Sequence, residues 1–594
     1  MNSRLFVFAL SAFGVVIGLK VEATTWHGGA SGDLADPANW NLSTLTGNED
    51  IRFETVGEYT LSKDMRVNSV TNAESRQVFD FSSKGTTLTI GTSAGVDCEH
   101  PVGFSSIKKG SELVFRGGKW VATKQAVFMA ANTYRDEPIP ECASSAHFTD
   151  GVSVTNFTWF LWGYRSYGMN VRVDAKSSIY ADNVVNYSNG GGNRLEICDG
   201  AKVYAANLMG TDYDVGSVGV DDGGNEICIY GEGTKVRAGK LLIGHSALNG
   251  RVVVTNRAEV AIGDLAIMGQ HSSLETEGAK FSVSGAFSIQ SSSNVVSFVD
   301  GEVSLPASIA VGGDGNTIKY VGQDVRTDSA KQSVGTVGKG TKWIVGKRSV
   351  AGYRGEGTHF DFDGDNATYF VEGGRFECSA DLGMGYASTN LFVEVSKGGV
   401  LSNLTASTYL GGRDGEGSGV GNTLRIGDSG RMEVASFRMC NHDNQLVISN
   451  GTVEITGDSL HFGWPVAAAT NNAVCLEGNR PVLRISKSQV VDRGGRVVFA
   501  PSASGGFAEA PLQVDGDLTF GNDSVFDLRI EDCLKNKSET SLPLVSCTGK
   551  LTLSEDVLDS IREKTADNRC KLEITDKAIT LKIVSNKGFV FIGR

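Results

Sequence analysis

The chain has 594 residues, of which 75 are glycine and only 10 are proline, and its formal net charge is −13. High glycine with little proline is typical of many short strands joined by tight turns, and it excludes a collagen-like or proline-rich chain. The acidic residues are spread along the sequence. This charge argues against nucleic acid or an anionic membrane as a partner.

Residues 1–23 have the pattern of a secretory signal peptide. Arg4 supplies the positive start, Leu5 to Leu19 is apolar, and a small-x-small cleavage site ends at Ala23. The alternative is an N-terminal anchor helix, for which this apolar run is short. No later stretch reaches 18 consecutive apolar residues. We therefore expect a secreted, extracellular or cell-surface protein with no membrane span in the mature chain.

Residues 24–104 are predicted to form an N-terminal cap with the first strands. Trp26 and Trp40 bracket a loop rich in Gly and Asp, and a pair of large aromatic rings could cover the open end of a stack of strands. The W-x-G…N-W opening, followed by alternating strands at Ile51–Thr71, resembles the start of exported bacterial proteins with autotransporter-associated β-strand repeats. The resemblance implies a passenger-like parallel β-helix and carries over no catalytic residue. Fewer than 100 residues follow Pro501, so we expect no translocator barrel, whose twelve strands would need well over a hundred.

Residues 105–500 are predicted to form a right-handed parallel β-helix. In Leu424–Ile455, apolar and polar residues alternate on both sides of Gly430 and again of Gly451, 21 positions later. Period-two alternation predicts half-buried strands, and glycine allows the positive φ of a sharp turn. Many copies at similar spacing predict stacked coils, and parallel crossovers set the hand. The turn residues are Gly110, Gly151, Gly200, Gly233, Asn256, Gly278, Gly301, Gly373, Gly398, Gly430, Gly451 and Gly478.

Two segments interrupt the repeats, 121–146 and 327–358, and we expect them to be lateral loops. The second is locally basic, with Lys339, Lys342, Lys347, Arg348 and Arg354. Loops on the flank of a rigid scaffold often carry binding residues. A solvated surface loop is the other interpretation.

Residues 501–594 are predicted to form a β-rich capping domain that hides the last edge of the helix. Ser554 followed by apolar residues at helical spacing predicts one short helix, and LEITDKAITLKIV predicts a closing hairpin. The ten cysteines lack a C-x-x-C motif. Those beside strands, Cys198, Cys228, Cys378 and Cys475, are expected to be buried and free, whereas one disulfide is expected among Cys533, Cys547 and Cys570.

The candidate chemistry is sparse. Asp361, Asp363 and Asp365 have the spacing of the start of a calcium loop, but the later bidentate Glu is missing. A second acidic turn, Asp221-Asp222, could hold a catalytic carboxylate pair. A third candidate is a histidine pair, His245 and His271, one coil apart. The simpler interpretations are polar turns and surface histidines, and we predict no catalytic, cofactor or metal site.

The leading hypothesis is an exported, calcium-independent β-helix with a structural or adhesin-like role. Its expected partners are glycans or other surface proteins, with no nucleic acid and no cofactor. The rival hypothesis is a polysaccharide-degrading enzyme, a lyase or a glycosidase, on a pectin-lyase-like β-helix. Fold alone cannot separate the two, because function depends on the site grafted onto it.

Overall fold

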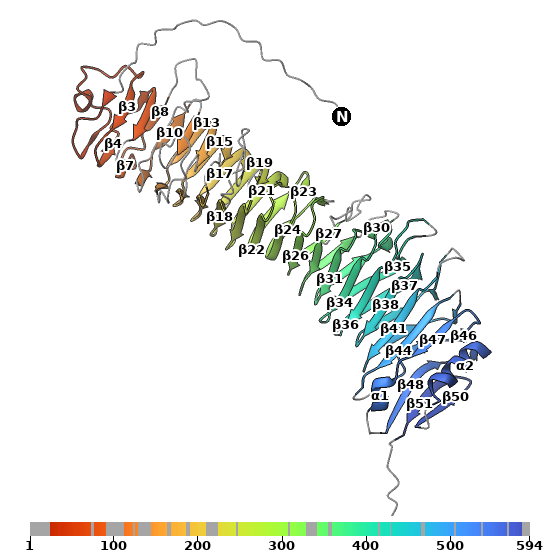
Figure 1. The fold of residues 1–594 in the computed structure, drawn as a ribbon. Coiled ribbons are helices and arrows are strands. Elements are labelled where there is room, and N and C mark those ends of the chain that lie inside the picture. Colours follow the sequence, from red (N-terminus) through yellow and green to blue (C-terminus); the bar gives the residue numbers. More distant parts are fainter. Residues whose placement is uncertain are drawn as a thin grey trace, which may run out of the picture.

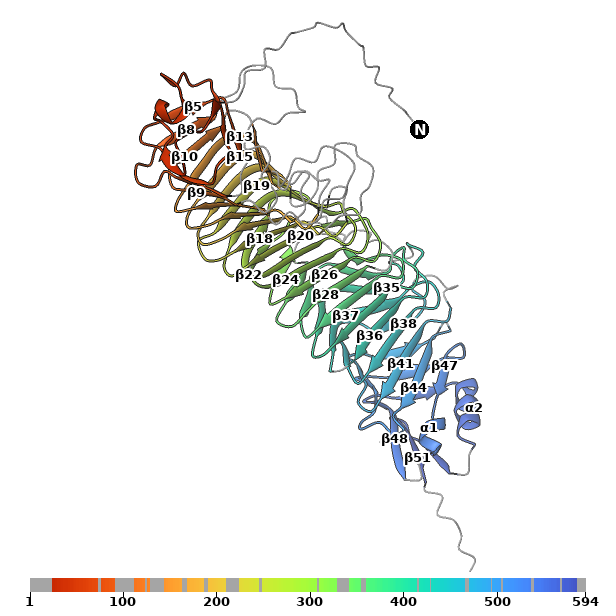
Figure 2. The same ribbon diagram turned by 60° about the vertical axis from the view of Figure 1, so that its left-hand side comes forward.

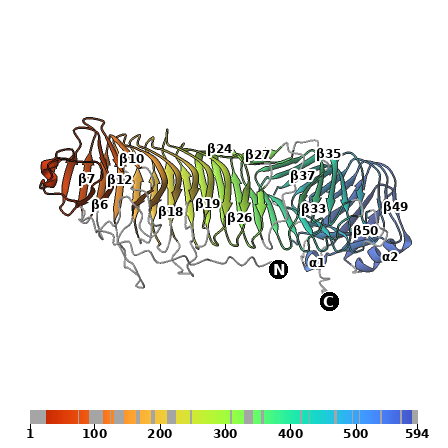
Figure 3. The ribbon, with the colours of Figure 1, turned by 90° about the horizontal axis from the view of Figure 1, so that it is seen from above.

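The computed structural model describes residues 24–72, 76–90, 112–122, 125–128, 144–162, 168–185, 191–209, 224–244, 248–306, 309–327, 341–353, 359–413, 416–427, 429–464, 470–492, 494–503, 506–535, 539–566 and 569–584. These residues form an elongated rod of stacked β-strands that runs from the N-terminal to the C-terminal end of the chain (Figure 1). The predicted all-β parallel β-helix is confirmed. Turning the rod by 60° shows the same stacking from another side (Figure 2), and the view from above shows its length (Figure 3).

Each turn of the rod contributes a strand to a first face, and these strands pair in parallel in one continuous ladder. The strands of the first face are β2 (Ser31–Asp33), β4 (Gly57–Thr60), β7 (Arg76–Asp80), β9 (Glu112–Arg116), β12 (Ser145–Thr149), β14 (Asn170–Val173), β16 (Arg194–Ile197), β18 (Glu226–Tyr230), β20 (Arg251–Thr255), the first halves of β22 (Ser273–Val283) and β24 (Val295–Ser304), β26 (Thr317–Val321), β28 (Lys342–Val345), β31 (Thr368–Glu372), β34 (Phe392–Ser396), β36 (Thr423–Gly427), β38 (Gln445–Ser449), β41 (Ala473–Gly478), β44 (Arg496–Pro501) and β47 (Val525–Leu528).

After a tight turn the chain enters a second face. Its strands are β5 (Met65–Val67), β8 (Thr87–Ile90), β10 (Lys119–Ala122), β13 (Ser153–Trp162), β15 (Ser178–Val185), β17 (Lys202–Met209), β19 (Lys235–Ile243), β21 (Glu259–Ile267), the second halves of β22 and β24, and then β27 (Asp324–Thr327), β29 (Val350–Tyr353), β32 (Arg375–Cys378), β35 (Val400–Leu410), β37 (Arg431–Met439), β39 (Thr452–Ile455), β42 (Val482–Ile485), β45 (Leu512–Val514) and β48 (Thr540–Cys547).

A third face closes the turn. It consists of the second halves of β13, β15, β17, β19, β21, β35 and β37 together with β11 (Gln125–Phe128), β23 (Phe287–Ile289), β25 (Ile309–Val311), β30 (His359–Phe362), β33 (Asp381–Met384), β40 (Leu460–His461), β43 (Gln489–Val491), β46 (Leu518–Phe520) and β49 (Leu551–Leu553).

The inward side chains form continuous apolar columns along the rod. In the predicted reference stretch, Leu424 lies opposite Leu446 and Ile426 opposite Ile448 on the next turn. All four are fully buried. Alternation along each strand puts every second side chain inside, so stacking turns in register converts a sequence pattern into one core.

The glycine at each turn has a reason that differs between positions. At Gly200 and Gly233 the φ angle is positive, as predicted. In the reference stretch the positive φ lies one residue earlier at both turns, at Ser429 and Asn450, and the predictions for Gly430 and Gly451 are wrong. A Cβ at Gly430 would lie 2.0 Å from the carbonyl oxygen of Val395, so this position requires glycine because the neighbouring turn passes too close.

A column of buried asparagines at the corner before the first face links successive turns. The Oδ1 atom of Asn444 accepts the backbone N–H of Asn422 at 2.9 Å, and Oδ1 of Asn472 accepts that of Asn444 at 3.1 Å. The same position is held by Asn193, Asn225, Asn294 and Asn316, and by Ser272 on one turn. Each side chain therefore satisfies a corner N–H that no strand partner reaches.

The N-terminal end carries an aromatic cluster. Trp26 and Trp40 pack edge to face with their ring centroids 4.9 Å apart, and both are almost fully buried. Trp40 ends the 3-10 helix η1 (Pro37–Trp40), and Phe53 and Tyr59 pack against the pair. A small sheet of β1 (Thr24–Thr25), β3 (Asp50–Phe53) and β6 (Ser69–Asn72) lies at the same end.

The C-terminal end is where parallel pairing stops. β48 pairs antiparallel with β51 (Ala578–Ile583), which pairs antiparallel with β50 (Cys570–Ile574), and this is the predicted hairpin. The predicted helix is α2 (Glu555–Lys564), and a further short helix, α1 (Glu531–Lys535), was not predicted. The parallel ladder extends beyond residues 105–500 at both ends, from β2 to β47.

The described parts of the two predicted lateral loops contain strands of the rod, whereas residues 123–124, 129–143, 328–340 and 354–358 lie outside the described residues. β11 lies within 121–146, and β28 and β29 lie within 327–358. The structure describes eight of the ten cysteines, and each of these eight is a thiol outside any disulfide. Burial of Cys198, Cys228, Cys378 and Cys475 is confirmed, and the disulfide expected among Cys533, Cys547 and Cys570 is not formed.

Candidate binding groove on the second and third faces

An open groove of about 740 Å³ runs across β15, β17, β19, β21 and β22. It lies where the second and third faces meet, because four of these strands bend from one face into the other without a break. Gly239 and Gly263 lie at the bend, and a Cβ at Gly263 would come within 2.3 Å of the Gly239 carbonyl oxygen. The close approach of the backbones keeps the bend free of side chains and leaves a hollow above it.

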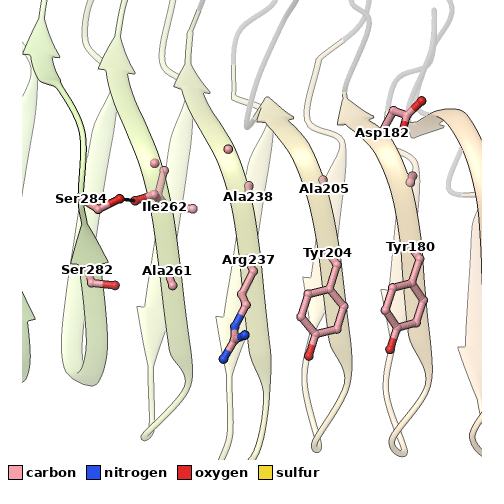
Figure 4. A pocket seen from close by; sticks show the side chains of 13 residues that line it. Tyr180, Asp182, Tyr204, Ala205, Arg237, Ala238, Ala261, Ile262, Ser282 and Ser284 are labelled. Atoms are coloured by element: carbon pink, nitrogen blue, oxygen red, sulfur yellow. Dashed lines mark hydrogen bonds between the residues drawn. The ribbon is translucent and has the colours of Figure 1, made fainter.

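Three outward side chains in one register column form a wall of the groove. Tyr180 lies opposite Tyr204, and Tyr204 opposite Arg237, on three successive turns. The two rings are nearly parallel, with centroids 4.9 Å apart and an interplanar angle of 13°. Figure 4 shows the rings and the guanidinium side by side on neighbouring strands, with Ala261 and Ser282 continuing the row.

The rings are accessible. Tyr180 is 42% exposed, which makes it one of the few large apolar side chains on the surface of the described residues. Tyr204 is half-buried. Burying an aromatic ring stabilises a protein, so a stacked pair with one ring exposed and one half-buried beside a groove is an unusual use of tyrosine. Such rings offer a ligand an apolar surface together with a phenolic hydroxyl group.

The charges around the rings are mostly positive. Arg237 is 58% exposed, and its nearest carboxylate is Glu259 on the next turn, at 3.8 Å. Lys235 holds the same carboxylate at 2.8 Å. The hydrogen bond from Lys235, together with the positive charges of Lys235 and Arg237, lowers the pKa of Glu259, although burial opposes the shift. Asp182 is the one carboxylate among the described residues that line the groove.

The three aspartates with calcium-loop spacing do not converge on one point. Asp361 lies 3.6 Å from Arg413 in an ion pair. Asp363 accepts from the backbone of Ala387 and from the Ser388 hydroxyl, and Asp365 accepts the N–H of Thr389 at 2.7 Å. The carboxylates therefore satisfy donors on neighbouring segments, the second and third on the next turn of the rod.

One other cluster has metal-ligating side chains. Asp174, Cys198 and Asp199 are the one group of three found within 4.8 Å among the described residues. Arg172 occupies this cluster, donating to Asp174 at 2.7 Å and to Asp199 at 3.4 Å. Burial raises the pKa of Cys198 to about 11. The carboxylates of the cluster are therefore paired with the Arg172 guanidinium, and the cluster forms an ion-pair network.

The remaining sequence candidates do not gather at one site. Asp221, Asp222, His245, Lys339 and Arg354 lie outside the described residues. His271 is an exposed turn residue with φ 55°. Lys342 and Lys347 are exposed, and Arg348 pairs with Asp300 at 2.8 Å.

The sequence analysis did not predict that the two tyrosines and Arg237 belong to a binding site, although the sequence contains a pattern that places two of them together. Tyr204 and Arg237 each lie four positions after a turn glycine, Gly200 and Gly233. Aligning the turns on these glycines would have put both residues in one column. Unequal insertions between turns hid the column, because Tyr180, Tyr204 and Arg237 are 24 and 33 positions apart.

Comparison with known proteins found no similar protein. No family model matches the chain, and neither the curated proteins nor the solved structures contain a match. Within the described residues no helix is both long enough and apolar enough to cross a membrane. Fold and groove geometry therefore carry the functional argument.

Proposed function

We propose that this chain is an exported β-helix protein of the cell surface or extracellular matrix that binds polysaccharide through the groove on its second and third faces. The observation that carries the proposal is the stacked pair of exposed Tyr180 and half-buried Tyr204 beside an open groove. The resemblance of the N-terminal opening to autotransporter-associated repeat proteins supports a surface location. The rod supplies the rigid scaffold on which such a site can be held.

The chemistry of the groove fits a sugar chain. The C–H groups on one side of a pyranose ring pack against an aromatic ring, and hydroxyl groups bond to the phenol and to nearby polar side chains. Tyr180 and Tyr204 lie on successive turns about 4.8 Å apart, so a chain running along the rod meets one ring after the other. The small residues Ala181, Ala205 and Gly239 keep the floor open.

A binding experiment tests this proposal. The double variant Tyr180→Ala/Tyr204→Ala is compared with the wild-type protein on a panel of neutral and charged polysaccharides, by affinity electrophoresis or calorimetry. We expect at least about a tenfold loss of affinity, equivalent to about 1.4 kcal/mol. Val295→Ala, which alters another exposed apolar residue on the first face, is the matched control and should bind normally.

The same samples separate binding from catalysis. Reducing ends or unsaturated uronates released from a polysaccharide would assign the chain to the rival class of degrading enzymes. Unchanged affinity of the double variant for every polymer that the wild type binds would show that the groove is not the site.

A further inference from the structure

Two neighbouring strands under the groove carry four cations and no carboxylate. β17 contributes Lys202, and β19 contributes Lys235, Arg237 and Lys240. The chain as a whole has a net charge of −13, so this local sign is the opposite of the average. All four residues lie on the turns that hold Tyr204 and the centre of the groove.

The positive charge is only partly neutralised. Glu259 is shared by Lys235 and Arg237. Lys202 and Lys240 are exposed and form no ion pair with a carboxylate of the described residues. Asp182 lines the groove, and Asp264 lies opposite Lys240 on the next turn. Three carboxylates against four cations leave a small excess of positive charge beside the rings. That excess attracts an anion over about one Debye length, roughly 8–10 Å at physiological salt.

The arrangement is linear. The residues Tyr180, Tyr204 and Arg237 follow one another along the axis of the rod, and Lys202 faces Lys235 in the adjacent column. A ligand that meets all of them must extend across the strands, parallel to the axis. A guanidinium binds carboxylate or sulfate oxygens through paired hydrogen bonds.

We propose that the groove is specific for a linear anionic polysaccharide, whose sugar rings pack on Tyr180 and Tyr204 and whose carboxylate or sulfate groups bind Lys202, Arg237 and Lys240. This inference rests on the proposed polysaccharide-binding function of the groove. It adds the charge class of the ligand and its direction along the rod.

The test uses matched polymer pairs with the full chain. Polygalacturonate is compared with its methyl ester, and dextran sulfate with dextran. The wild-type protein should bind at least one charged polymer about tenfold or more tightly than its uncharged partner, and this preference should decrease as the salt concentration rises. In the double variant Arg237→Gln/Lys240→Gln the preference should be lost. Lys319→Gln, which removes an exposed lysine on the first face, is the control and should keep the preference.

The outcomes separate the two proposals. Preference for polygalacturonate alone assigns carboxylate as the recognised group, and preference for dextran sulfate alone assigns sulfate. Equal binding of charged and uncharged polymers that is lost in Tyr180→Ala/Tyr204→Ala overturns the anionic inference and leaves the proposed function intact. Failure of the wild type to bind any of the four polymers, or a preference that survives in Arg237→Gln/Lys240→Gln, overturns the inference as well.

Discussion

At the scale of single residues, the asparagine column stabilises the corners of the rod through hydrogen bonds between successive turns. Asn444 is fully buried, accepts the N–H of Asn422 and donates to the Cys440 carbonyl oxygen at 2.6 Å. The substitution Asn444→Ala leaves both of these backbone groups without that partner. An unsatisfied buried polar group costs about 1–3 kcal/mol.

We therefore expect Asn444→Ala to lower the unfolding free energy of this region by about that amount, measured by urea denaturation. Gln445→Ala changes the exposed next residue and should have little effect. A variant at Asn444 as stable as the wild type would show that the side chain is not needed at the corner.

Asp363 gives the rod a pH-dependent element. Burial, together with repulsion from Asp361 and Asp365, raises its pKa above the ordinary value of 3.8. The folded state therefore holds this proton more tightly than the unfolded state does. The contribution to stability is fully present below pH 3.8 and is lost as the pH rises through the raised pKa.

Asp363→Asn removes the ionisation, so the variant should gain stability relative to the wild type as the pH is raised from 3.8 to neutral. Thermal unfolding over this pH range measures the difference in stability between the variant and the wild type. The matched control is Asp365→Asn, which changes a carboxylate on the same turn. A constant difference between variant and wild type at every pH would contradict the expectation.

Single residues also show how much of the structure could be predicted from the sequence alone. Burial of Leu424 and Ile426 was predictable, because alternation along a strand leaves only one consistent inward side. The role of Gly430 was not, because its close neighbour Val395 lies 35 positions earlier in the sequence. The Tyr204–Arg237 column was hidden for a related reason. Contacts between turns depend on register, and insertions of unequal length conceal the register.

At the scale of elements, helix α2 protects the last turns of the rod. Its Ser554 N-cap accepts the N–H of Val557 at 3.4 Å, and Val557 and Ile561 are buried. The N-cap and the apolar spacing of this helix were both predicted from the sequence. Helix α1 was missed because five residues contain too little periodicity to recognise.

Ile561→Ala should lower stability by about 2–5 kcal/mol, because it leaves a cavity under the helix. Ser554→Ala should cost about 0.5–2 kcal/mol, and Ser554→Asp, which keeps an N-cap acceptor, should cost less. Urea denaturation followed by circular dichroism measures all three. Equal losses for the alanine and aspartate variants would contradict the capping role of Ser554.

At the scale of the whole molecule, each turn of the rod is in contact mainly with the turns before and after it. Stability in such a stack is approximately the sum of terms for each turn and for each interface between neighbours. Distant turns are therefore only weakly coupled. The groove across β15 to β22 lies far along the rod from the asparagine corner at Asn444 (Figure 1), so polysaccharide binding and stability at that corner should vary independently.

A cavity placed in one turn tests this nearest-neighbour architecture. Ile448 on β38 is fully buried between Ile426 on β36 and Leu476 on β41, and Ile448→Ala should cost about 2–5 kcal/mol there. Hydrogen exchange measured by mass spectrometry should show lost protection in β36, β38 and β41 and unchanged protection in β20 and β22. The reciprocal variant Val252→Ala on β20, whose side chain is also buried, should affect β18 and β22 and leave β38 protected. Uniform loss of protection along the rod in either variant would show instead that the turns unfold as one cooperative unit.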